Sequence, residues 1–153
     1  MRAPLKTKNR QSGFTIIEIM IVLAVASLIM LIVFLAVPAL QRNARNTNRT
    51  SDATKIAAAV NECLANTNDT VASCNTVAAI SGVTLDVSTL RKLTTLGVTG
   101  AFPAVANTTT ANFVFGQKCT SDGTNFAAGD TAQFVVIYNA ETASSSTHRC
   151  ING

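Results

Sequence analysis

The stretch that decides the fold is Ser12 to Leu40, which reads SGFTIIEIMIVLAVASLIMLIVFLAVPAL. It carries one charged side chain, Glu18, and the 19 residues from Ile19 to Val37 carry none. A helix of that length rises roughly 28 Å, which is close to the ~30 Å of hydrocarbon in a bilayer. The sequence therefore predicts a membrane-spanning helix with a single acidic residue near its start.

A short basic leader precedes this helix. Residues 1–13 contain four Lys or Arg residues and no acidic residue, so the positive-inside rule keeps them in the cytoplasm and sends the chain after Leu40 outward. A secretory signal has a shorter apolar run that ends in a small-residue cleavage site. Here the candidate cleavage site, Gly13–Phe14, lies before the apolar run. We therefore expect the apolar helix to stay on the processed product.

The leader and the start of the helix together resemble the class III signal of type IV prepilins. The shared features are a basic leader ending in Gly13, then Phe14, and Glu18 four residues further on. The resemblance implies that a prepilin peptidase cuts after Gly13 and methylates the new amino terminus on Phe14. It also implies that Glu18 guides subunits into register in a homo-oligomeric helical filament. A membrane platform protein and an assembly ATPase would be further partners.

The carboxylate of Glu18 needs a physical explanation. Placing it in hydrocarbon costs on the order of 2.5 to 3.5 kcal/mol on insertion scales, so an intramembrane acid is expected to have a partner. The new amine on Phe14 of the same chain lies about 6 Å of helix rise away and points elsewhere. We therefore expect Glu18 to pair with the amine of a neighbouring subunit. The alternative is a protonated Glu18 in a simple signal anchor.

The chain divides into four segments. Residues 1–13 form the leader, 14–40 the transmembrane and assembly helix, 41–66 its amphipathic continuation, and 67–153 an extracytoplasmic globular domain packed on that continuation. A long helix from about Phe14 to Asn66 is indicated by an apolar stripe at helical spacing. The stripe consists of Ile56, Val60, Cys63 and Leu64.

Three arginines, Arg42, Arg45 and Arg49, lie on one side of the predicted helix just beyond the apolar span. We expect them to form a solvated or headgroup-facing stripe. The alternative is contact with acidic residues of adjacent subunits.

The carboxyl-terminal third is predicted to form a sheet. Residues 112–118 and 133–138 have the β-branched and aromatic content of strands, and 147–151 would form a final short strand. Before them, Asp86 or Ser88 is expected to cap a short helix closed by Gly97. Its apolar positions at helical spacing are Leu90, Leu93 and Leu96. The predicted fold is therefore α+β and pilin-like, with an antiparallel sheet of three or four strands packed on the long helix.

The four cysteines form an even set on the outward side of the anchor, where thiols are usually oxidised. Three pairings are open. We favour Cys63 with Cys74, which fastens the helix end to the following loop, and Cys119 with Cys150. The second bridge resembles the carboxyl-terminal disulfide region of many pilins. Closing a loop of about 30 residues in this way contributes roughly 3 to 4 kcal/mol in the chain-entropy model.

Composition argues against a catalyst and against a general nucleic-acid binder. Without the leader, the chain has eight basic and eight acidic side chains, so these charges cancel. DNA binding is therefore unsupported and could occur only through a local basic patch. No triad, metal cluster or phosphate loop is recognisable, and we expect no cofactor. His148 is interpreted as an exposed loop residue. Asp122, Asn125 and Asp130 are interpreted as turn residues in preference to a calcium site.

The sequence thus predicts a structural protein. It would be a type IV pilin that is stored in the membrane, cut after Gly13, and polymerised at the cell surface through its apolar helix for adhesion, motility or DNA uptake. One alternative is a pseudopilin of a type II secretion or competence system. Another is a signal-anchored binding module that works as a monomer, and an enzyme is not expected.

Overall fold

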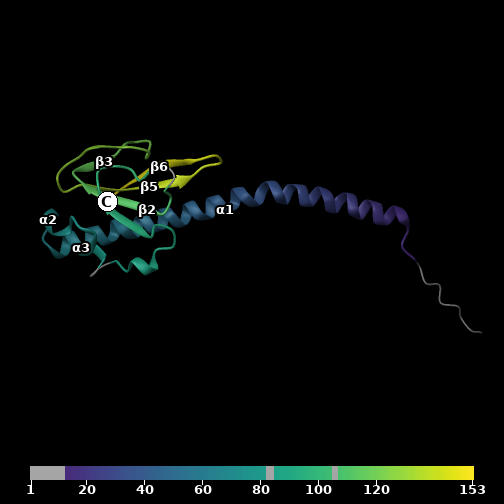
Figure 1. Cartoon of the computed structure of the whole chain (residues 1–153), viewed down its shortest axis with the longest axis horizontal. Helices are drawn as coiled ribbons and strands as arrows, with labels where there is room; N and C mark the ends of the chain where they lie inside the picture. The colour runs from purple at the N-terminus through teal and green to yellow at the C-terminus, as the bar shows by residue number, and fades with distance from the viewer. Residues whose placement is uncertain (1–12, 82–84, 105–106) are drawn as a thin grey trace, which may run out of the picture. The chain divides into compact units, whose positions relative to one another are not determined.

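The computed structural model describes residues 13–81, 85–104 and 107–153, and Figure 1 shows the arrangement of the elements. The chain forms two compact units, Met1–Pro38 and Ala39–Gly153. The leader predicted at residues 1–13 lies outside the described residues except for Gly13.

One helix accounts for a third of the sequence. Helix α1 spans Ile16–Asn66, 51 residues, which confirms the predicted long helix with a start two residues later. Pro38 lies inside it. Proline removes one backbone donor and crowds the preceding turn, yet the helix does not end there.

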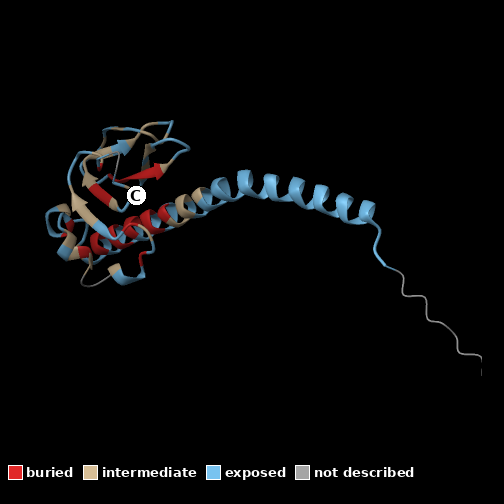
Figure 2. Cartoon of the chain, turned by 45° about the vertical axis from the view of Figure 1, so that its right-hand side comes forward, coloured by how far each residue is buried: buried red, intermediate tan, exposed pale blue. Residues whose placement is uncertain are grey.

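The second half of α1 carries the apolar face of the unit Ala39–Gly153, which we call the outer unit. Figure 2 shows buried residues along this part of the helix. The predicted stripe is correct, because all of its members are buried: Ile56, Val60, Cys63 and Leu64. They belong to one core cluster together with Phe113, Phe134 and Val136 of the sheet.

Helix α1 ends in a tight turn. Asn68 and Asp69 both adopt positive φ, 50° and 59°, and the amide of Asp69 donates to the carbonyl of Leu64 at 2.9 Å. Two short helices that the sequence did not indicate follow, α2 (Val71–Cys74) and α3 (Val77–Ser81). The Cys63–Cys74 disulfide links the end of α1 to α2.

Four strands form the main sheet in the order β1-β2-β5-β6. Their bounds are β1 Thr95–Val98, β2 Thr110–Phe115, β5 Phe134–Glu141 and β6 Ser146–Asn152. The pairs β2–β5 and β5–β6 are antiparallel as predicted, whereas β1 pairs with β2 in parallel. The sheet is therefore mixed and not purely antiparallel as predicted. The difference comes from β1, which was not predicted as a strand.

The short helix predicted from Asp86 or Ser88 to Leu96 is wrong. Only a 3-10 turn, η1 (Val87–Thr89), forms there, with Asp86 as its cap, and Leu96 lies in β1. The cause is a contact distant in sequence. One carboxylate oxygen of Asp52 accepts the backbone amides of residues 91, 92 and 93 at 2.9, 2.6 and 3.1 Å. These amides are therefore held by α1.

The strand predicted at residues 112–118 is divided in two. Gly116 adopts a φ of 74° and ends β2, and a second strand, β3 (Gln117–Cys119), then pairs with β4 (Phe126–Ala128) in a separate two-stranded sheet. A positive φ is readily available only to glycine, so the break falls at this residue.

Two asparagines of the sheet hold the segment that precedes β2. Asn139 is fully buried, and its amide nitrogen donates to the carbonyls of Pro103, Ala104 and Asn107 at 3.0, 2.8 and 3.0 Å. Asn112 donates to the carbonyl of Ala101 at 2.8 Å. These bonds satisfy backbone carbonyls that would otherwise require water.

The outer edge of β6 is also occupied. The amide of Cys150 donates to the carbonyl of Gly123 at 2.9 Å, and the side-chain oxygen of Asn152 accepts from the amide of Cys119 at 2.7 Å. The Cys119–Cys150 disulfide joins the same two segments. The structure thus contains both disulfides that the sequence favoured.

Candidate functional site

The predicted cleavage site lies at the start of the described chain, just before α1. Phe14 is 84% exposed, and apart from its two chain neighbours no residue has a heavy atom within 4 Å of the position where a Cβ on Gly13 would be. Both residues are outside regular structure. The peptide bond between them is therefore accessible to a peptidase.

Glu18 lies in the first turn of α1 and caps it. Its Oε2 accepts from the backbone amide of Thr15 at 3.2 Å and from the Thr15 hydroxyl at 3.1 Å, and the amide of Glu18 lies 3.4 Å from that hydroxyl. This reciprocal arrangement is a capping box, in which Thr at the cap and Glu three residues later satisfy amides that the helix leaves free.

The capping box is a function of Glu18 that the sequence analysis did not consider. The signal was present in the Thr15-Ile16-Ile17-Glu18 spacing. All of the hydrogen bonds that Glu18 accepts go to Oε2, so Oε1 has no partner among the described residues. One carboxylate oxygen therefore organises the helix start, and the other is free to meet a cation from outside the chain.

The rest of this segment presents an apolar surface. Within the part of the chain that the structure describes, every exposed large hydrophobic residue lies between Phe14 and Leu40. The helix is long and apolar enough to cross a membrane, and none of its most apolar window is buried. Exposed apolar surface of this extent marks contact with a membrane or another protein.

Ser27 is a polar residue within this surface. Its hydroxyl donates to the carbonyl of Leu23, one turn earlier, at 2.8 Å. The hydroxyl is thereby satisfied inside the helix, as a dry environment requires. Ser27 therefore does not oppose contact with lipid or with another helix.

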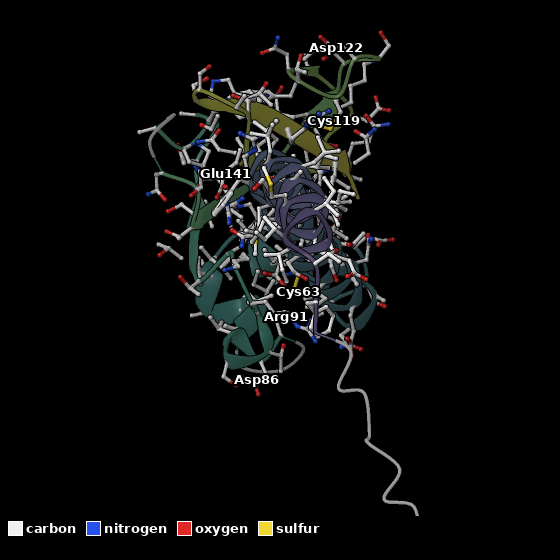
Figure 3. The ribbon with its side chains drawn as sticks, turned by 90° about the vertical axis from the view of Figure 1, so that its right-hand side faces the viewer. Cys63, Asp86, Arg91, Cys119, Asp122 and Glu141 are labelled. Atoms are coloured by element: carbon white, nitrogen blue, oxygen red, sulfur yellow. A yellow bond between two sulfur atoms is a disulfide. The ribbon has the colours of Figure 1, made fainter. Side chains whose placement is uncertain are left out.

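The arginine stripe has a role that neither sequence interpretation predicted. The guanidinium groups of Arg45 and Arg49 form ion pairs with Glu141, the last residue of β5, which is labelled in Figure 3. The side chain of Arg49 is 3% exposed, so it is neither solvated nor available to a neighbouring subunit. The third arginine, Arg42, lies 3.4 Å from the carbonyl of Ala143.

Asn46 completes this connection between α1 and β5. Its amide nitrogen donates to the carbonyl of Glu141, and its oxygen accepts the amide of Glu141, both at 2.8 Å. The hydrogen bond from Arg45, supported by Arg49, lowers the pKa of Glu141 to about 2. The cluster therefore ties the end of β5 to the helix and has a structural role.

The remaining polar candidates are also structural. The prediction that His148 is an exposed loop residue is wrong, because it lies in β6, where its ring stacks on Phe102 at 4.2 Å and its Nδ1 lies 2.8 Å from Oδ1 of Asn139. Asp122 accepts hydrogen bonds from Thr120 and Thr124, which lower its pKa to about 2. Within residues 13–81, 85–104 and 107–153, no group of acidic, His and Cys residues could hold a metal ion.

Comparison with known protein families identifies the first segment. Residues 8–34 match the family model described as the prokaryotic N-terminal methylation motif, the class III signal peptide of type IV pilins. No curated protein and no solved structure matches the chain. The chain thus carries a prepilin-peptidase signal on an α+β, pilin-like architecture.

Proposed function

We propose that this chain is the structural subunit of a type IV pilus. A prepilin peptidase would cut after Gly13 and methylate Phe14, and the apolar part of α1 would then assemble with that of other copies. The observation that carries the proposal is the combination of a fully exposed apolar helix with one carboxylate, Glu18, whose Oε1 is free. The proposed role is structural and not catalytic.

The energetics keep the apolar helix out of water and leave its assembly to packing and polar contacts. Burying one Val, Leu, Ile, Phe or Met side chain contributes about 1.5 to 3 kcal/mol relative to exposure in water, so the segment must leave water. In the bilayer that driving force is already satisfied, and helix association depends on packing and on polar contacts. A subunit displaced along the helix would bring its Phe14 amine to Oε1 of Glu18.

Three kinds of partner follow from this proposal. The membrane holds the precursor, with its basic leader in the cytoplasm, and the peptidase processes it there. A platform protein and an assembly ATPase would then transfer subunits into a homo-oligomeric filament at the cell surface. Adhesion, motility and DNA uptake all remain compatible with such a filament.

The experiment has two parts. Mass spectrometry of the exported protein should give an amino terminus at a methylated Phe14. In a host that supplies the assembly machinery, Glu18→Ala should reach the membrane but lose surface filaments, while Asp130→Ala, at an exposed acid in the loop before β5, should assemble normally. Normal filaments from Glu18→Ala, or a retained leader, would refute the proposal.

A pseudopilin of a secretion or competence system is the second candidate, because the matched segment is the processing signal alone. Filaments sheared from the cell surface discriminate between the two. A pilin should be their main component, whereas a pseudopilin should be processed identically but be scarce in that fraction.

A further inference from the structure

We propose that the outer units of neighbouring copies bind head to tail, with Asp69 of one copy paired to Arg149 of another. This inference rests on the filament proposed above and names a contact that the apolar helices do not supply. Two surface features carry it. One is a polar recess beside residues 43–50 of α1, and the other is the charged turn that follows the end of α1.

The first feature is a recess of about 460 Å³ between α1 and the β5–β6 pair, which we call the proximal recess. One helical face of α1 forms one wall, with side chains at spacings of three and four residues. The opposite wall includes a tyrosine and an exposed arginine. The main lining residues are Asn43, Asn46, Thr47, Thr50, Tyr138 and Arg149.

Hydrogen bonding inside the proximal recess leaves few free donors. The Thr50 hydroxyl donates to the carbonyl of Asn46 at 3.1 Å, so in the 2.9 Å contact with Tyr138 the phenol is the donor. The Thr47 hydroxyl donates to the carbonyl of Asn43 at 3.0 Å. The donors that remain are the guanidinium of Arg149 and the side-chain amide of Asn43. An anionic group is the ligand that they fit.

Arg149 lacks an internal counterion. Among the residues that the structure describes, the two ion pairs both use Glu141, with Arg45 and Arg49. Arg149 is exposed at the rim of the proximal recess. Its charge is therefore available to a carboxylate from outside the chain.

The second feature is the turn after α1, which we call the distal turn. Asn68 and Asp69 are both exposed and both adopt positive φ, a conformation that is uncommon for residues other than glycine. The Cys63–Cys74 disulfide and the Asp69–Leu64 hydrogen bond hold the turn in place. No cation forms an ion pair with Asp69 in the described part of the chain, so its carboxylate is displayed on a fixed backbone.

The charges along the outer part of α1 have a direction. From Arg42 to Lys55 the helix carries four basic residues, of which Arg45 and Arg49 pair with Glu141, and one buried acid, Asp52. From there to the distal turn its only charged residues are acids, Glu62 and Asp69. Copies in a filament built from parallel helices point the same way, so the basic end of one copy faces the acidic end of another.

The helix sets the distance between the two features. From Thr47 to the end of α1 the helix rises about 28 Å. Copies that make this contact are therefore offset by about 30 Å along the helix axis. Pairing of Glu18 with a neighbouring amine requires an offset of only about 6 Å, so the head-to-tail contact links copies several steps apart.

Charge reversal with rescue tests the contact in the full-length, processed protein. In a host with the assembly machinery, Arg149→Glu and Asp69→Lys should each lower the yield of sheared filaments about tenfold. The double variant should restore most of the yield. The matched control reverses two other exposed charges, Lys118→Glu and Asp130→Lys, singly and together, and should leave the yield unchanged.

Folding and processing are measured in the same cells. The membrane pool of each variant should have the wild-type abundance, a processed amino terminus and both disulfides on non-reducing gels. Single variants that assemble as well as the wild type, or a double variant no better than the poorer single one, would overturn the contact. If the wild type itself forms no filaments, the proposed function fails instead.

Discussion

The cluster around Glu141 yields a prediction whose magnitude follows from its geometry. In Glu141→Gln, one amide oxygen can still accept from one arginine, but the amide nitrogen then faces the donors of the other. Arg49 has a side chain only 3% exposed, so it would lose its counterion in a buried position. Breaking a buried pair by removing one partner costs about 3 to 5 kcal/mol.

Two features of the cluster reduce this cost. The Glu141 side chain is 22% exposed, so solvent partly screens the charge. Arg49 also keeps its bonds to the carbonyl of Thr108 and the side chain of Asn46, at 2.8 and 3.0 Å. The lowered pKa is of the same order, because a fall from 4.5 to about 2 corresponds to about 3 kcal/mol before solvent screening. We expect Glu141→Gln to lower the free energy of unfolding by about 2 kcal/mol.

The assay uses the single tyrosine of the chain. Tyr138 is buried in the outer unit and the sequence has no tryptophan, so tyrosine fluorescence reports unfolding of that unit in urea, with the protein in detergent micelles. The urea midpoint should fall by about 1 M at pH 7. Glu62→Gln, an exposed acid on α1, is the control and should change the midpoint by less than about 0.3 M.

The pH dependence provides the decisive comparison. The pKa of Glu141 is lowered in the folded state, so its contribution is complete above about pH 4.5 and is lost as the pH falls towards 2. The wild type and Glu141→Gln should therefore converge in stability near pH 2. A difference that is absent at pH 7, or that persists unchanged at pH 2, would show that the ion pairs do not stabilise the fold.

Three further predictions concern other parts of the fold. In Asn139→Asp an oxygen replaces the nitrogen that donates to three carbonyls, so the free energy of unfolding should fall by about 3 kcal/mol or more. Proteolysis between residues 99 and 104 should become faster, and a loss below about 1 kcal/mol would contradict the proposed role of these bonds. In Gly129→Ala the new Cβ would lie 2.9 Å from the carbonyl carbon of Gln117, so urea titration should show a loss of about 1 to 3 kcal/mol, and wild-type stability would show that β3 can move away. Replacing Cys63 and Cys74 by serine opens a loop of 11 residues and should cost about 3 kcal/mol, measured by the same titration; an unchanged midpoint would mean that the helix end is held without the bridge.

The sequence is most informative where structure depends on neighbouring residues. The long helix could be predicted from its uncharged apolar run and from the periodic apolar stripe that follows it, and its start from a cleavage pattern a few residues long. Even the capping role of Glu18 was readable, because Thr15 and Glu18 have the spacing of a capping box. These features need no knowledge of distant contacts.

The error between Asp86 and Gly97 shows where local reasoning fails. Leu90, Leu93 and Leu96 repeat at helical spacing, but Asp52 binds the amides of residues 91–93 and holds them at α1. Gly97 does not end a helix. It faces Asn112 across the β1–β2 pair, where a Cβ would collide with the Asn112 side chain.

The interpretation of the arginine stripe was also wrong because of a contact distant in sequence. Arg49 and Glu141 are 92 positions apart, and no local pattern marks either as a partner of the other. In the candidate site, the position of the acidic residue Glu18 could be read from the sequence. Which of its two oxygens is committed to the helix start became visible only in the structure.

The occupied edge of β6 would have a consequence in the proposed filament, where many copies lie close together. An open strand edge is a template on which other chains can extend a sheet, and a fibre surface would place many such edges close together. Here the Gly123 carbonyl accepts from the Cys150 amide on that edge, the Asn152 side chain accepts from the Cys119 amide of the covering segment, and the Cys119–Cys150 disulfide holds that segment in place. Oxidation outside the cell would thus protect the array against amyloid-like growth between its own members.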